Sequence, residues 1–132
     1  MAVQIPAQIP KEIDQIFQNI KEFFKEKNRK IEINPELLKD NNGINYLWIE
    51  FEKLEFSENE FKDFIDFLND LGFYNSNGAE NKILDYIGYK EHIIYDEYRH
   101  MSKDILIYLK YYKTILNNEI LIYLDILAIN YN

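Results

Sequence analysis

The stretch from Tyr46 to Phe56 (YLWIEFEKLEF) constrains the fold most, because apolar and charged residues alternate along it. Successive side chains of a β-strand point to opposite faces of the sheet, so a period of two predicts a strand with one apolar face. The apolar face is expected to hold Leu47, Ile49 and Phe51, and the other face Trp48, Glu50 and Glu52. This is the strand that the sequence predicts most clearly.

A helix is expected directly after this strand. Ser57 and Glu60 stand at the spacing of a capping box, in which a hydroxyl and a carboxylate each accept a hydrogen bond from a free backbone N–H group. The apolar residues that follow recur at helical spacing: Phe61, Phe64, Ile65, Leu68 and Leu71. Gly72 is placed to end the helix with a positive φ.

The N-terminal part predicts an extended tail over residues 1–10 and then a helix from Lys11. The buried side of that helix is formed by Ile13, Ile16, Phe17, Ile20, Phe23 and Phe24. Residues 31–33 are expected to form a short strand, and Asn34-Pro35 a helical turn that stops near Asn42-Gly43. With 132 residues in all, residues 11–132 are expected to form a single globular domain.

The rest of the chain is harder to assign. Residues 74–80 have the composition of a mobile loop, and a helix is expected from Lys82 to Gly88. Ser102 can cap a helix over 102–116, which we favour, while 119–130 stays open because the same residues fit a β-hairpin that turns at Asn117-Asn118.

The expected fold class is therefore α+β: a small domain with an N-terminal helix, a short antiparallel sheet around residues 46–56, and further helices. An all-α fold is the alternative.

Composition excludes several classes of function. The chain contains 23 acidic and 15 basic residues, a net charge of −8, which disfavours direct binding to nucleic acid. The absence of cysteine excludes disulfides and cysteine-based metal centres. The chain has no nucleotide-binding or nucleophile motif, no secretory signal and no uninterrupted apolar span. We expect a cytoplasmic protein that is not an enzyme, has no cofactor and does not enter a membrane.

The excess of acidic residues is concentrated in one segment. Residues 50–70 contain eight acids and two lysines. In a helix, Glu60, Asp63, Asp66 and Asp70 would form an outward row, which Glu50 and Glu52 on the preceding strand would extend if their face is exposed. These six carboxylates are the predicted partner-binding residues, although an ordinary solvated surface would show the same pattern.

Two other features allow different functions. If residues 91–100 were helical, His92, Asp96 and His100 would lie close to one face and could hold a metal ion, although chance produces such spacing easily. The eleven tyrosines, several of them between Tyr86 and Tyr112, suit either a core or an interface.

We therefore expect a small acidic inhibitor that binds a basic partner protein, such as an immunity protein that neutralises a toxin or a phage-encoded, anti-CRISPR-type inhibitor of a nucleic-acid-binding defence complex. A structural or assembly subunit with a tyrosine-rich interface, including a homo-oligomer, is the second hypothesis, and a metal-binding protein is the third.

Overall fold

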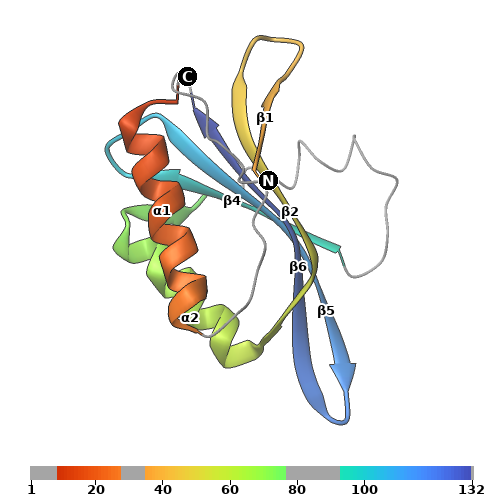
Figure 1. The fold of residues 1–132 in the computed structure, drawn as a ribbon. Helices are drawn as coiled ribbons and strands as arrows, with labels where there is room; N and C mark the ends of the chain where they lie inside the picture. The colour runs from red at the N-terminus through yellow and green to blue at the C-terminus, as the bar shows by residue number, and fades with distance from the viewer. Residues whose placement is uncertain (1–8, 28–34, 77–92, 132) are drawn as a thin grey trace.

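A computed structural model of the chain describes residues 9–27, 35–76 and 93–131. In these residues the chain forms two helices and six strands (Figure 1). The helices are α1 (Lys11–Glu26) and α2 (Glu58–Asp70). The strands are β1 (Glu36–Lys39), β2 (Asn45–Ser57), β3 (Phe73–Asn75), β4 (Ile93–His100), β5 (Ile105–Leu116) and β6 (Glu119–Tyr131).

The strands form one curled antiparallel sheet in the order β1-β2-β6-β5-β4-β3 (Figure 1). The long strands β2, β6 and β5 lie side by side, and both helices pack against the same face of this sheet. The other face carries no helix in the part of the chain that the structure describes. This asymmetry leaves one sheet face for the core and makes the other a candidate surface for binding.

Phenylalanine rings join the two helices to the sheet. The Phe64 ring of α2 lies 5.4 Å from the Phe24 ring of α1 and 6.1 Å from the Phe56 ring of β2. The Phe24 ring is also 5.9 Å from the ring of Phe51. All four side chains are buried, so this cluster is the centre of the core between the helices and the sheet.

The local predictions for the first half are largely confirmed. The helix from Lys11 is α1, and the alternating stretch is β2, with Leu47, Ile49 and Phe51 buried. The capping box is present: the Glu60 N–H donates to the Ser57 hydroxyl at 3.2 Å, and the Ser57 N–H donates to the Glu60 carboxylate at 3.1 Å. Gly72 follows α2 with φ +98°, as expected.

The predicted fold class is wrong, because the structure contains much more sheet and fewer helices than the sequence led us to expect. Strands hold 53% of the described residues and helices 29%, so the domain is mostly β, and neither a short sheet with further helices nor an all-α fold describes it. The expected helix over 102–116 is instead β5, which pairs along its whole length with β6. The physical reason is the turn: Asn117 and Asn118 adopt φ of 53° and 64°, as a tight hairpin requires, and asparagine tolerates this conformation.

The expected helical turn after Asn34-Pro35 is also wrong, because residues 36–39 form β1 and pair with β2. The Asp40 carboxylate accepts the N–H groups of Asn42 at 2.8 Å and Ile44 at 2.9 Å, which closes a hairpin turn in place of a helical one. The start of the expected 74–80 loop belongs to β3. The rest of that loop after residue 76, the 82–88 helix and the 31–33 strand lie outside the described residues.

Neither of the two helices in the described ranges is long and apolar enough to cross a membrane.

Candidate protein-binding surface

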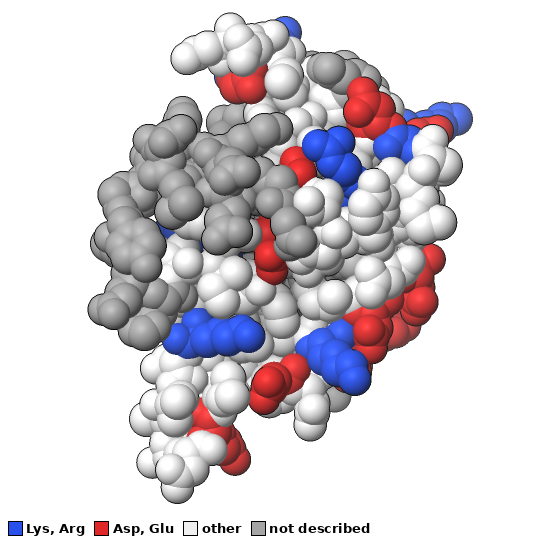
Figure 2. Space-filling model, turned by 180° about the vertical axis from the view of Figure 1, so that it is seen from behind, with Lys and Arg blue, Asp and Glu red and all other residues white. Residues whose placement is uncertain are grey.

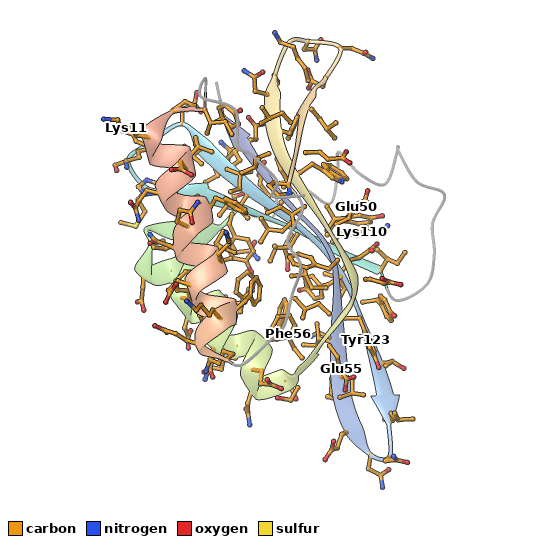
Figure 3. The ribbon with its side chains drawn as sticks, in the orientation of Figure 1. Lys11, Glu50, Glu55, Phe56, Lys110 and Tyr123 are labelled. Carbon is orange, nitrogen blue, oxygen red and sulfur yellow. The ribbon has the colours of Figure 1, made fainter. Side chains whose placement is uncertain are left out.

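The candidate site is the sheet face that points away from α1 and α2, here called the helix-free face. Strand alternation and register place its residues in rows across β2, β6 and β5, and Figure 3 shows Glu50, Glu55, Lys110 and Tyr123 on this side. The helix-free face is defined by Trp48, Glu50 and Glu55 of β2, Tyr123 and Asp125 of β6, and Tyr108, Lys110 and Tyr112 of β5.

The structure separates the six predicted carboxylates into two sets. Glu50 and Glu52 are exposed on β2, and because they flank the buried Phe51 they point away from the core. Asp66 and Asp70 are exposed on α2, on the opposite side of the sheet. In the view of Figure 2, the acidic surface likewise falls into separate areas, with basic and uncharged surface between them.

Two of the four predicted carboxylates on α2 have structural partners. The Glu60 carboxylate belongs to the capping box, and the Asp63 carboxylate lies 3.3 Å from the Lys27 ammonium. Both Asp63 and Lys27 are largely exposed, so this ion pair contributes little to stability. On α2, Asp66 and Asp70 thus remain as exposed carboxylates with no ion pair to another described residue.

One row of the helix-free face combines a carboxylate with two aromatic rings. Glu55 of β2 stands opposite Tyr123 of β6, and Tyr123 stands opposite Tyr112 of β5. The two tyrosine rings are stacked, with centroids 5.0 Å apart and planes 19° from parallel. Desolvation raises the pKa of Tyr123, and so do the Glu55 carboxylate and the Tyr112 phenol.

The neighbouring carboxylates are held by hydrogen bonds and ion pairs. The Trp48 indole N–H donates to the Glu50 carboxylate at 3.0 Å, and the Lys110 ammonium lies 2.9 Å from the Asp125 carboxylate. The β5–β6 register shifts beside Lys110, and this bulge places Asp125 within its reach. These contacts orient the Glu50 carboxylate and neutralise the charge of Asp125.

Sequence reasoning missed a buried carboxylate at the other end of the same face. The sequence alone indicates solvated surface at Asp96 and Glu97, but Glu97 is fully buried. Its Oε2 accepts the Ser76 hydroxyl at 2.5 Å and lies 3.6 Å from the Arg99 Nε, while Oε1 has no hydrogen-bond partner among the described residues. Asp96 points to the helix side, where it accepts the Tyr111 hydroxyl at 2.6 Å.

The helical arrangement behind the metal hypothesis is absent. Asp96 and His100 lie on strand β4, about 13 Å apart along the chain, and His92 lies outside the described residues. No group of three or more possible ligands occurs within the described ranges. His100 has its own structural contacts. Its Nε2 lies 3.1 Å from the Leu71 carbonyl oxygen, and its Nδ1 accepts the Ser102 N–H at 3.1 Å. Ser102 caps no helix, because the residues that follow it form strand β5.

The β5–β6 hairpin ends in an exposed apolar tip, formed by Ile115, Leu116 and Ile120. Their exposed fractions are 74%, 56% and 39%. Figure 1 shows that this hairpin projects beyond the helices. Residues 113–116 of β5 lie past the end of its pairing with β4, so within the described ranges only β6 supports them. Such exposed apolar groups are a second possible contact surface.

Comparisons of this chain with protein-family models, with curated proteins and with solved structures found no match. Its function is therefore inferred from the residues of the chain itself.

The tyrosines of β4 and β5 predict a loss of stability at high pH. Desolvation, together with nearby carboxylates (Asp96 for Tyr98, Glu97 for Tyr108), raises the pKa of both phenols from 10.0 to about 12. In the unfolded chain these phenols ionise near pH 10, so below that pH their contribution to the free energy of unfolding is fully present. Between pH 10 and 12 the unfolded state releases protons that the folded state keeps, and the free energy of unfolding should fall.

Urea unfolding at about pH 9 and about pH 11 measures this fall. Tyr108→Phe is the matched variant, because it removes one of the two phenols and keeps its ring. The fall should be smaller in Tyr108→Phe than in the unmodified chain. Equal stability of the unmodified chain at both pH values would contradict the prediction.

Proposed function

We propose that this protein binds a basic partner protein through the helix-free face and blocks that partner without catalysing a reaction. Immunity proteins and anti-CRISPR-type inhibitors of nucleic-acid-binding complexes are the classes that this proposal includes. The observation that carries the proposal is the combination on one sheet face of exposed carboxylates, Glu50 and Glu55, with the stacked pair of Tyr112 and Tyr123.

The aromatic side chains suit an interface because they offer a large contact area with little conformational entropy to lose. Trp48, Tyr112 and Tyr123 are all half-buried on the helix-free face, where the sheet backbone holds them rigidly. Tyrosine and tryptophan are enriched among the residues that dominate binding energies. A rigid sheet that presents them supports tight association.

The charge suits a basic partner. The whole chain has a net charge of −8, and Glu50, Glu52 and Glu55 are exposed along a single strand. Long-range attraction of this kind accelerates encounter with a positively charged surface and weakens as salt increases. A surface that normally binds phosphates has the required positive charge, so occupying it would block nucleic-acid binding.

The test compares two charge reversals that are equal in net charge but lie on opposite sides of the sheet. Glu50→Lys/Glu52→Lys changes β2, and Asp66→Lys/Asp70→Lys changes α2. Each pair of substitutions replaces two carboxylates with two ammonium groups. Proteins retained from source-cell lysate by each variant are identified by mass spectrometry at low and at high salt.

We expect a basic protein that the unmodified chain retains at low salt, that high salt releases, and that the β2 variant loses. The α2 variant should retain it. Loss with the α2 variant alone would contradict the use of the helix-free face. Loss of the retained protein only with Ile115→Ser/Leu116→Ser, and no effect of salt, would favour the assembly hypothesis with the apolar tip as the contact surface. The matched control is Leu37→Ser/Leu38→Ser, which changes two exposed leucines at the β1 end of the sheet.

A further inference from the structure

The end of the β5–β6 hairpin leaves one strand edge open. Residues 113–120 are all exposed, and Figure 1 shows this part of the hairpin standing clear of the helices. Strand β4 stops pairing with β5 at Tyr112, so within the described ranges β5 has a neighbouring strand on only one side from Lys113 to Leu116. The backbone on the other side of this stretch can pair with a further strand.

The turn determines which residue offers its backbone groups at this edge. The Asn117-Asn118 turn has two residues, and Leu116 stands opposite Glu119 across it. The residues that flank such a turn form a hydrogen-bonded pair, and hydrogen-bonded pairs alternate with non-hydrogen-bonded pairs along an antiparallel ladder. The next pair, Ile115 with Ile120, is therefore non-hydrogen-bonded, and the Ile115 N–H and C=O point away from β6 to the open edge.

We propose that this edge pairs with the same edge of a second copy of the chain, in an antiparallel, two-fold arrangement that places Ile115 opposite its own counterpart. The two isoleucines would exchange both of their backbone hydrogen bonds, so identical edges satisfy each other. The sheet would then continue through both copies, with the two helix-free faces on the same side. This contact lies outside the helix-free face and does not depend on the proposed function.

The charge and the apolar side chains of the hairpin end suit a second copy better than a basic partner. Residues 113–120 contain one lysine and one glutamate, so this end is neutral in a chain of net charge −8. Ile115 is 74% exposed and Leu116 is 56% exposed, and the two-fold register covers each Ile115 side chain with an identical one. In that register Lys113 stands opposite Asn117, so no like charges face each other directly.

The two strands at the edges of the sheet are protected against such pairing, in contrast to this part of β5. Strand β1 has four residues with a charge at each end, Glu36 and Lys39, and it follows Pro35. Strand β3 has only three residues. Short length, charge and proline all discourage pairing between sheet edges. Residues 114–118 carry neither a charge nor a proline, so nothing in their sequence opposes a second strand.

Sedimentation equilibrium of the full chain tests for this dimer. Only a few residues of each copy take part, so association should be weak compared with that of stable dimers, which bury about 1,600 Å². The mean mass should rise from that of a monomer toward that of a dimer between about 10 µM and about 1 mM chain. Association should strengthen about two- to fivefold between about 0.05 M and about 0.5 M salt, because screening weakens the repulsion between two acidic chains. Binding of a basic partner changes with salt in the opposite direction.

Two variants of opposite charge test the register. Ile115→Lys and Ile115→Glu should each weaken self-association by about tenfold or more, because each new charge would face an identical charge. A one-to-one mixture of the two variants should associate again, since lysine would then face glutamate. Leu38→Lys is the matched control, because Leu38 is an exposed apolar residue of β1, and it should associate as the unmodified chain does. A circular dichroism spectrum checks that each variant is folded.

A single monomer mass over the whole concentration range would overturn the inference, and it is also the result expected if the open edge accepts a strand of another protein instead. Association that Ile115→Lys does not weaken would overturn it as well. So would a mixture of the two charged variants that stays monomeric, since residue 115 would then not face its counterpart. These outcomes are distinct from failure of the proposed function, which is measured by partner capture through Glu50 and Glu52.

Discussion

Replacing Phe64 with alanine is expected to lower the free energy of unfolding by about 3–5 kcal/mol. Phe64 is completely buried, and its ring lies 5.4 Å from that of Phe24, 5.6 Å from that of Phe23 and 6.1 Å from that of Phe56. Removing the ring takes away apolar burial and leaves a cavity where α1, α2 and β2 meet. Urea unfolding monitored by circular dichroism measures the loss.

Lys62→Ala is the control, because Lys62 is exposed on the same helix and its truncation should change stability by no more than about 0.5 kcal/mol. If Phe64→Ala does not fold, Phe64→Leu gives a smaller cavity and a measurable intermediate loss. A loss below about 1 kcal/mol for Phe64→Ala would show that the ring cluster is not the centre of the core.

Replacing Gly72 with alanine is expected to destabilise the fold by about 2–4 kcal/mol. Gly72 has φ +98°, which costs an L-residue energy on its own. A Cβ at this position would also lie 2.7 Å from the His100 Nε2, which is 3.1 Å from the Leu71 carbonyl oxygen. The His100 ring cannot move away without breaking that contact, so the clash adds to the conformational cost.

Gly43→Ala is the matched control, because it carries the conformational cost without the clash. Gly43 has φ +81°, and the atom nearest to an added Cβ is the Lys39 Cε at 4.0 Å. Its substitution should cost about 1–2 kcal/mol. Thermal or urea unfolding of both variants gives the difference, and equal losses would show that the His100 ring yields easily.

The parts of the fold that the sequence predicts correctly are those with local signals. The alternation around Leu47, Ile49 and Phe51 marks β2, and Ser57 with Glu60 marks the start of α2. In the C-terminal third the Asn117-Asn118 turn is the one local signal, and the strands on either side of it lack a clear alternation, because β5 and β6 are interior strands with half-buried residues on their second face. Ile105 and Leu109 therefore fit a helical spacing and a strand equally well, and only pairing with distant strands decides between them.

The candidate site could be predicted only in part. Glu50 follows from the alternation of β2, since a residue next to the buried Ile49 and Phe51 must point outward. The row of Glu55, Tyr123 and Tyr112 depends on register across three strands, which no local pattern encodes. Glu97 has no sequence signal either, because its burial depends on tertiary packing and its hydroxyl partner, Ser76, is 21 residues away.

Strand alternation also sets how this protein can change over evolutionary time. Outside the bulges near Glu50 and Asp125, neighbouring residues on β2, β5 and β6 face the core and the helix-free face in turn, so exposed positions on the helix-free face can be substituted one at a time while the packed positions stay the same. An insertion or deletion of a single residue in β6 would exchange the two sets and disturb both. Lineages of this protein should therefore diversify by point substitution on the helix-free face while strand lengths stay constant.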